Sequence, residues 1–142
     1  MKKIFNSFLI VAVMASVASI SSCTKTCDPG YEGSDCKTEV RTKFLANNKV
    51  TTDNCAGSGY NMSITADSDV EYIVFSNLGN FTTPAVVKAK VSGTTFSYTN
   101  FIDATGRKFT GTGSVSGNII TLTYTVVYTD NTTETCNVTV AL

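Results

Sequence analysis

The chain has 142 residues, 11 basic and 11 acidic side chains, five cysteines, and neither histidine nor tryptophan. The lack of histidine excludes Ser-His-Asp and Cys-His catalysis and any histidine-ligated metal site. A balanced charge without a basic run also excludes the electrostatic footprint of a nucleic-acid-binding protein.

The N-terminus has the layout of a secretory signal. Met1-Lys2-Lys3 is followed by an apolar run that is densest from Phe8 to Val17, and then by the small residues of Ile20-Ser21-Ser22-Cys23. A membrane-spanning helix needs about 20 mainly apolar residues, and polar residues interrupt this stretch. We therefore predict a signal peptide over residues 1–22, which takes no part in the fold.

Ile20-Ser21-Ser22-Cys23 resembles a bacterial lipobox, in which the cysteine is acylated and becomes the mature N-terminus. The alternative is an ordinary thiol at Cys23 with cleavage elsewhere, but acylation removes the one odd cysteine of a secreted chain. Two or more acyl chains would anchor the protein durably to the membrane. Thr24-Lys25-Thr26 carries no acidic surface-export cluster, which favours a periplasm-facing position on the outer membrane.

Residues 23–37 form the predicted anchor and a cysteine hook. Cys27 to Cys36 reads CxxGYxGxxC, which resembles the last hairpin of an EGF-like domain. The resemblance implies a Cys27–Cys36 disulfide, worth about 2–3 kcal/mol for so short a loop. Gly33 permits a positive φ beside an aromatic residue. The hook is either a stapled spacer between lipid and domain or a docking element for a partner.

Residues 38–142 are predicted to form an antiparallel β domain. Thr38 to Leu45 favours one or two helical turns, with Val40, Phe44 and Leu45 on one side. The rest is rich in Thr, Ser, Val, Ile, Tyr and Phe, which is typical of strands. Apolar and polar residues alternate in the predicted strands, whose ranges are 60–65, 87–91, 108–115, 120–128 and 136–142.

Three further segments complete the predicted sheet. Residues 49–52 are a first strand candidate, and residues 70–76 and 94–101 read as more fully buried strands. Gly93 and Gly117 each lie between two strand patterns, as tight hairpin turns require, and Asp130-Asn131 is a third candidate turn. The predicted fold is therefore an all-β, up-and-down meander of seven or eight strands, closed as a barrel or folded as a sandwich.

Cys55 and Cys136 remain to pair after the other cysteines are assigned. Their bridge would join the first strand to the last and stabilise the fold by about 4–5 kcal/mol. Terminal strands are neighbours in a closed barrel, so this pairing favours the barrel.

These features together resemble a group of small lipoproteins from Gram-negative bacteria. The matching pieces are the Cys27–Cys36 hook, the segment from Thr38 to Leu45, and the Thr-rich segment from Val115 to Thr125. The β portion is also lipocalin-like, although no tryptophan follows Leu45 where lipocalins carry Gly-x-Trp. The group implies no settled activity.

The candidates for acid–base chemistry are carboxylates, and most of them fall at predicted turns, where Asp suits the local backbone. They are Asp53, Asp67, Asp69, Glu71, Asp103, Asp130 and Glu134. The alternating oxygens of Asp67 to Glu71 could suit calcium, but the segment lacks the length and Gly of an EF-hand loop, so we predict no metal site.

Aromatic residues are abundant on the predicted dry faces. They either fill the core or line a cavity for a small apolar ligand, in which case Gly111 and Gly113 leave space; alternatively, these glycines lie under large aromatics. The candidate ligand-binding residues are Tyr60, Tyr72, Phe96, Tyr98, Phe109 and Tyr124.

We therefore predict a non-enzymatic, lipid-anchored envelope protein, without a cofactor, that binds a small apolar ligand in a β barrel. The alternative is a structural or protein-interaction module with no ligand cavity and an exposed apolar patch. An enzyme would require a convergent carboxylate pair.

Overall fold

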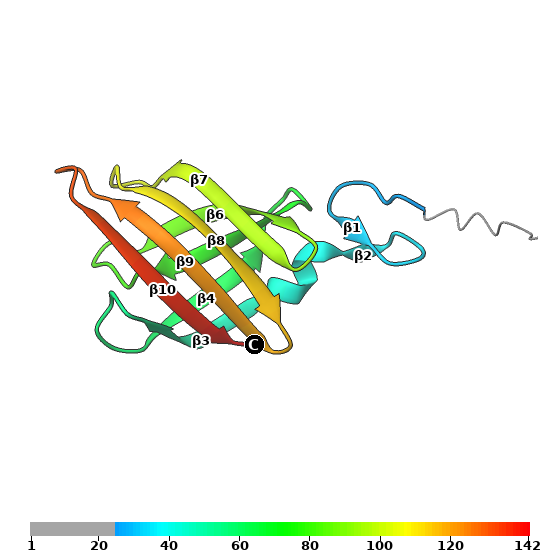
Figure 1. Ribbon diagram of the computed structural model, residues 1–142, viewed down its shortest axis with the longest axis horizontal. Helices are drawn as coiled ribbons and strands as arrows, with labels where there is room; N and C mark the ends of the chain where they lie inside the picture. Colours follow the sequence, from blue (N-terminus) through cyan, green and yellow to red (C-terminus); the bar gives the residue numbers. More distant parts are fainter. Residues whose placement is uncertain (1–24) are drawn as a thin grey trace, which may run out of the picture.

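Eight antiparallel strands close into a barrel in the computed structural model, which describes residues 25–142 (Figure 1). The predicted signal peptide over residues 1–22 and the predicted lipid-bearing Cys23 lie outside the described residues. Each strand pairs with its neighbours in sequence, and the last strand pairs with the first. The barrel strands are β3 (Ala46–Asp53), β4 (Tyr60–Ala66), β5 (Tyr72–Leu78), β6 (Ala85–Ser92), β7 (Thr95–Ile102), β8 (Lys108–Ser116), β9 (Ile119–Val127) and β10 (Thr133–Ala141). The predicted all-β meander is confirmed, and the barrel replaces the sandwich alternative.

Alternation of apolar and polar residues produces the closed sheet. In β4, Tyr60, Met62 and Ile64 are buried inside the barrel, while the residues between them face outward. Two predicted hairpin turns are confirmed, since Gly93 and Gly117 have φ values of +56° and +57°. These left-handed conformations suit glycine because it has no Cβ.

Two predictions about strand burial are wrong. Residues 70–76 and 94–101 were expected to be more fully buried, but β5 and β7 both alternate between an inner and an outer face. In β7, Phe96 and Tyr98 face the core while Thr95, Ser97 and Thr99 are exposed. Because a single closed barrel covers only one face of each strand, the opposite face remains at the solvent.

The 3-10 helix η1 (Val40–Phe44) closes one end of the barrel. It confirms the predicted helical turn, and its Val40 and Phe44 are buried in the core. Phe44 meets Phe96 edge to face, with ring centroids 5.5 Å apart. Leu45 was expected on the same side but is 40% exposed, because the chain has turned into an extended conformation there.

A buried ion pair lies at the opposite end of the barrel. Arg107 donates through Nε to Asp103 Oδ2 at 2.7 Å and through a second nitrogen to the Thr83 carbonyl at 2.8 Å. Its guanidinium also lies over the Phe81 ring, 4.1 Å from the centroid. Burial opposes ionisation of Asp103, but the hydrogen bonds from Arg107 and Thr105 outweigh it and lower the pKa of that carboxyl.

The hook is docked on the end of the barrel that η1 closes. It is held by the Cys27–Cys36 disulfide, which is confirmed, and by the pairing of β1 (Tyr31–Glu32) with β2 (Thr38–Glu39). Gly33 has the predicted positive φ, at +87°. Thr38 and Glu39 thus pair with the hook, although we assigned them to the β domain.

Two contacts join the hook to η1. Val40 donates its N–H to the Gly30 carbonyl at 2.9 Å, and Lys43 pairs with Glu32 at 2.6 Å. In the described part of the chain, no helix is long and apolar enough to cross a membrane.

The predicted Cys55–Cys136 disulfide is confirmed, with the two Cα atoms 5.5 Å apart. It joins the β3–β4 connection to β10. The ladder between β10 and β3 is short, with Val138, Thr139 and Val140 paired to Asp53, Thr52 and Thr51. The disulfide therefore reinforces the seam at which the barrel closes.

Strands β6 and β7 pair only next to their hairpin. Their ladder ends at Lys90 opposite Ser97, and the remaining halves of the two strands do not pair with each other. Beyond that point the β7–β8 register shifts between Tyr98 and Phe101, where Asn100 has a φ of +52°. The β6 and β7 strands therefore separate beyond Lys90 and Ser97, which leaves a gap in the hydrogen-bonded wall of the barrel.

Candidate functional site

A buried carboxyl inside the barrel collects three hydrogen bonds. Asp53, at the end of β3, is 7% exposed. Its Oδ2 accepts from the hydroxyls of Tyr60 at 3.1 Å and Tyr124 at 3.0 Å, and its Oδ1 accepts from the Cys55 N–H at 2.9 Å. Tyr60 Oη in turn accepts from the Gly79 N–H at 2.9 Å. The cluster links β3, β4 and β9 with the β5–β6 loop.

Burial raises the pKa of the hydroxyls of Tyr60 and Tyr124 well above their usual range, and the nearby Asp53 carboxyl adds to this. Burial has the same effect on the pKa of Tyr98, which lies on β7. Within residues 25–142, the Tyr98 hydroxyl has no hydrogen-bond partner. The phenols are therefore neutral at physiological pH, which suits a structural role better than a general base.

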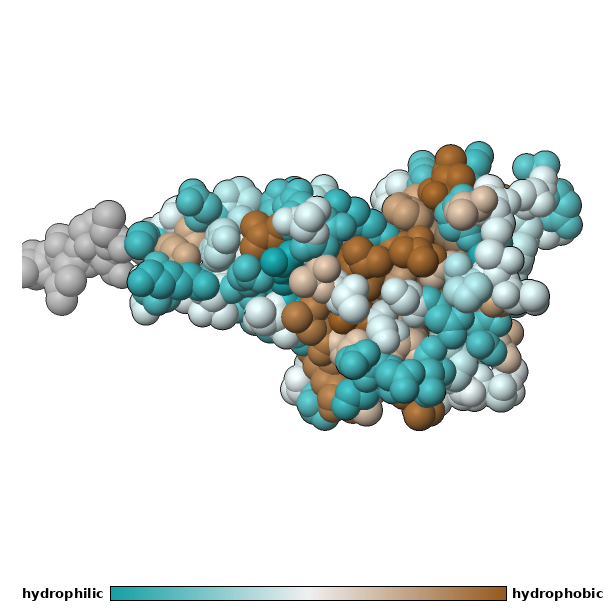
Figure 2. Space-filling view, turned by 180° about the vertical axis from the view of Figure 1, so that it is seen from behind, coloured by the Kyte–Doolittle hydropathy of each residue, from teal (hydrophilic) through white to brown (hydrophobic). Residues whose placement is uncertain are grey.

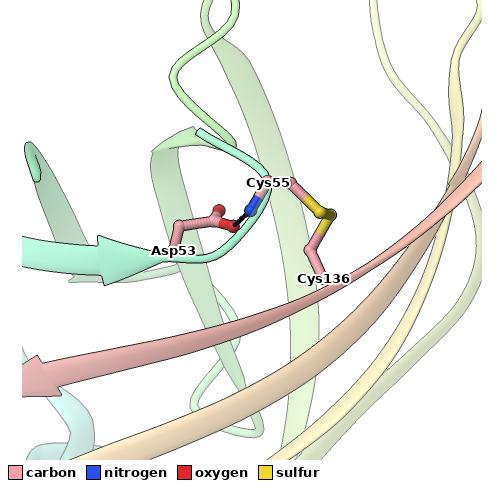
Figure 3. Close-up of side chains that lie close together, drawn as sticks. All are labelled: Asp53, Cys55 and Cys136. Atoms are coloured by element: carbon pink, nitrogen blue, oxygen red, sulfur yellow. Dashed lines mark hydrogen bonds between the residues drawn. A yellow bond between two sulfur atoms is a disulfide. The ribbon is translucent and has the colours of Figure 1, made fainter. Parts of the chain in front are cut away.

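Cysteine and carboxylate ligands also meet beside this cluster. The carboxyl oxygen of Asp53 and the sulfurs of Cys55 and Cys136 lie within 4.8 Å of one another (Figure 3). The two sulfurs are joined in the disulfide, and the Asp53 carboxyl is turned toward the Cys55 N–H. A thiolate is the form of cysteine that binds metal, so the oxidised pair does not provide a metal site.

Five of the six candidate ligand-binding residues lie inside the barrel, and all five are buried: Tyr60, Phe96, Tyr98, Phe109 and Tyr124. Four of them, all except Tyr60, pack against other core aromatic rings, for example Phe96 against Phe75 at 5.1 Å between centroids and Phe109 against Tyr124 at 6.2 Å. Tyr72 lies on the outer face, where the Lys88 ammonium is 4.2 Å from its ring centroid.

The two inward-facing glycines lie under aromatic side chains. A Cβ at Gly113 would come 2.2 Å from the Phe96 ring, and a Cβ at Gly111 would come 2.5 Å from the Tyr98 hydroxyl oxygen. Of the two alternatives for these glycines, the structure supports aromatic packing. The space that they leave is already filled.

Most of the remaining acidic residues stabilise turns, as predicted. The carboxyls of Asp67, Asp69, Asp103 and Asp130 each accept the N–H of the residue two positions later. Asp53 does the same with Cys55, but it is buried rather than solvated. The sequence signal for its second role was weak, since Tyr124 lies 71 positions from Asp53 along the chain.

Two hollows on the outer surface meet at β7. The larger, of about 680 Å³, lies over β7 to β10 and is lined mainly by Ser, Thr and Asn side chains. The smaller, of about 510 Å³, lies where β6 and β7 part. Lys90 and Ser97 line both hollows, which therefore adjoin each other. Sequence reasoning missed both, although the Thr-x-Thr repeats of the strands were visible.

Comparisons of the chain with protein-family models, with curated proteins and with solved structures find no match.

Proposed function

We propose that this chain is a lipid-anchored protein of the bacterial cell envelope, and that its β barrel is a non-enzymatic binding module that engages a partner through its outer surface. The packing of side chains throughout the barrel interior is the observation that supports this proposal. Inward side chains of all eight strands and of η1 pack in one core, and the two larger hollows are on the outside.

A small apolar ligand inside the barrel stays a prediction from the sequence. Binding there would require core side chains to move, and protein interiors are packed as densely as organic crystals. Phe75, Phe109 and Tyr124 are each at most 1% exposed, and they contact other aromatic rings. An outer-surface partner requires no such rearrangement.

The anchoring half of the proposal is supported by the lipobox-like Ile20-Ser21-Ser22-Cys23 and by the docked hook. Cys23 precedes Cys27 by four residues, and the hook contacts η1 at one end of the barrel (Figure 1). A lipid on Cys23 would therefore place the η1 end next to the membrane. The sides of the barrel would remain accessible to other envelope components.

Labelling with an alkyne-tagged fatty acid in a Gram-negative host tests the anchor. The wild-type protein is expected to carry the label and to sediment with membranes, whereas Cys23→Ser is expected to lose both properties. Ser22→Ala is the matched control, since it keeps a small residue before the cysteine and should still be labelled. Undiminished labelling of Cys23→Ser would contradict the proposal.

A further inference from the structure

The outer faces of β7 to β10 form a surface that is rich in hydroxyl groups, which we call the threonine face. Strand register arranges its side chains in two rows across the four strands. One row is Ser97, Thr112, Thr123 and Asn137, and the other is Thr95, Ser114, Thr121 and Thr139. Neighbouring strands lie about 4.8 Å apart, so each row presents a hydrogen-bonding group at that interval.

The threonine face is hollowed and nearly free of charge. All eight side chains line the hollow of about 680 Å³, and Lys90 is the single charged residue among those lining it. A hydroxyl both donates and accepts hydrogen bonds. The face therefore suits a neutral ligand that also carries many donors and acceptors.

The cleft between β6 and β7 adds an aromatic surface at one edge of the threonine face. Phe101 pairs with Phe109 and packs against the core, yet it is only half-buried and lines the cleft. The lysines at the cleft already have partners, since Lys88 pairs with Asp67 at 2.9 Å and Lys90 with Glu71 at 3.0 Å. A charged ligand would have to compete with these ion pairs.

We propose that the threonine face and this cleft form one extended site for a neutral glycan. Sugar hydroxyls would bond to the two rows, and the apolar face of a sugar ring would lie against Phe101 in the cleft. The proposal rests on the outer-surface binding role inferred above and names the class of partner. Figure 2 shows apolar patches on the side of the barrel that is seen from behind. Within residues 25–142, none of the exposed large apolar side chains lines either hollow; they are Leu45, Val50, Val86, Ile102 and Ile119.

The test uses the lipidated, full mature chain in a detergent without sugar headgroups, because a glycosidic detergent would compete for the site. The protein is applied to an array of neutral oligosaccharides of glucose, mannose, galactose and N-acetylglucosamine, together with uronic-acid and sulfated glycans. We expect a neutral oligosaccharide to bind with a Kd between about 10 μM and 1 mM in calorimetry, and longer chains to bind more tightly.

Matched variants locate the site. Thr112→Val with Thr139→Val removes two exposed hydroxyls from the rows and should weaken binding roughly tenfold, given the usual worth of a hydrogen bond. Thr133→Val removes an exposed hydroxyl of β10 that does not line either hollow, and it should leave the Kd unchanged. Both substitutions keep a β-branched residue, so the strands retain their propensity.

Three results would overturn the proposal: no neutral glycan binding at 1 mM, binding of the uronic-acid or sulfated glycans alone, or equal affinities for the double variant and Thr133→Val. None of them would affect the fatty-acid labelling of Cys23. Failure of the glycan site and failure of the anchor are therefore separable.

Discussion

Asp53 is the residue on which the polar interior depends. It is buried among apolar side chains, and its carboxyl accepts from Tyr60, Tyr124 and Cys55. Removing the donor to a buried acceptor lowers the free energy of unfolding by about 1–3 kcal/mol. Removing a buried hydroxyl that has no hydrogen-bond partner costs little stability. The tyrosines of the core should consequently differ in their effect on stability.

Tyr124→Phe is expected to lower the free energy of unfolding by about 1–3 kcal/mol, because it removes a donor to Asp53. Tyr98→Phe is the matched control, since the Tyr98 hydroxyl has no partner within residues 25–142. Its effect should be close to zero or slightly stabilising. Urea denaturation of both variants measures the difference, and equal losses would contradict this account of the cluster.

Gly113→Ala is expected to lower the free energy of unfolding by about 1–3 kcal/mol, because an added methyl group overpacks the core. The added Cβ would meet the Phe96 ring at 2.2 Å and the Thr121 carbonyl oxygen at 2.5 Å. Gly59→Ala is the control, because its Cβ would meet its nearest neighbours at 3.5 Å. If the two alanine variants unfold at the same urea concentration, the close packing of β8 against Phe96 is refuted.

The identity of the core residues could be predicted from the sequence better than their partners. Alternation correctly placed Tyr60, Phe109 and Tyr124 on inner faces, because a strand has a period of two residues. It failed for Tyr72, which lies in a continuous apolar run where alternation is hidden. The bond between Asp53 and Tyr124 joins residues that are remote in sequence, so no local pattern announces it.

At the scale of elements, the two disulfides have different tasks. Cys55–Cys136 closes a loop with a sequence separation of 81 and holds the barrel seam, whereas Cys27–Cys36 spans nine positions within the hook. Longer closed loops restrict the unfolded chain more strongly. Only the first disulfide should therefore govern the stability of the barrel.

Replacing Cys55 and Cys136 together by alanine should lower the free energy of unfolding by about 4–5 kcal/mol in the chain-entropy model. Replacing Cys27 and Cys36 by serine should leave the unfolding midpoint of the barrel nearly unchanged, because the hook packs outside it. Circular dichroism in urea compares the two pairs. A larger loss from the hook pair would show that the hook belongs to the cooperative core.

Most elements could be predicted, but their spatial relations could not. The glycine turns at Gly93 and Gly117 led to a meander of seven or eight strands, and the elimination of cysteine pairs favoured a closed barrel over a sandwich. The parting of β6 from β7 depends on where their ladder stops, at Lys90 and Ser97, and on the irregularity at Asn100. Neither feature follows from the local sequence, so the outer cleft was not anticipated.

At the scale of the whole molecule, stability should fall at alkaline pH. Burial raises the pKa of Tyr60, Tyr98 and Tyr124 far above the ordinary value of 10.0. Below that value both the folded and the unfolded chain keep these protons, and the full stability is present. Above it the unfolded tyrosines ionise while the folded ones do not, so rising pH favours unfolding.

The urea midpoint is therefore expected to decline from about pH 10 upward, and the decline should be shallower in Tyr124→Phe, which lacks one of the titrating groups. Burial also raises the pKa of Tyr128 to about 12, so it adds to the same trend. Measurements at constant ionic strength separate this effect from general charge repulsion. A midpoint that stays constant to about pH 11 would contradict the assignment of these phenols as buried and neutral.

Native mass spectrometry of the full-length protein, exported by a Gram-negative host and released gently from its membranes, tests the central claim most directly. The account predicts a chain that begins at Cys23, carries covalent acyl groups, is lighter by the four hydrogens of two disulfides, and holds no small apolar molecule. A chain without acyl groups would contradict the anchor. An additional mass of a few hundred daltons that is lost on denaturation and identified as an apolar compound would contradict the filled barrel. It would support the binding of a small apolar ligand inside the barrel instead.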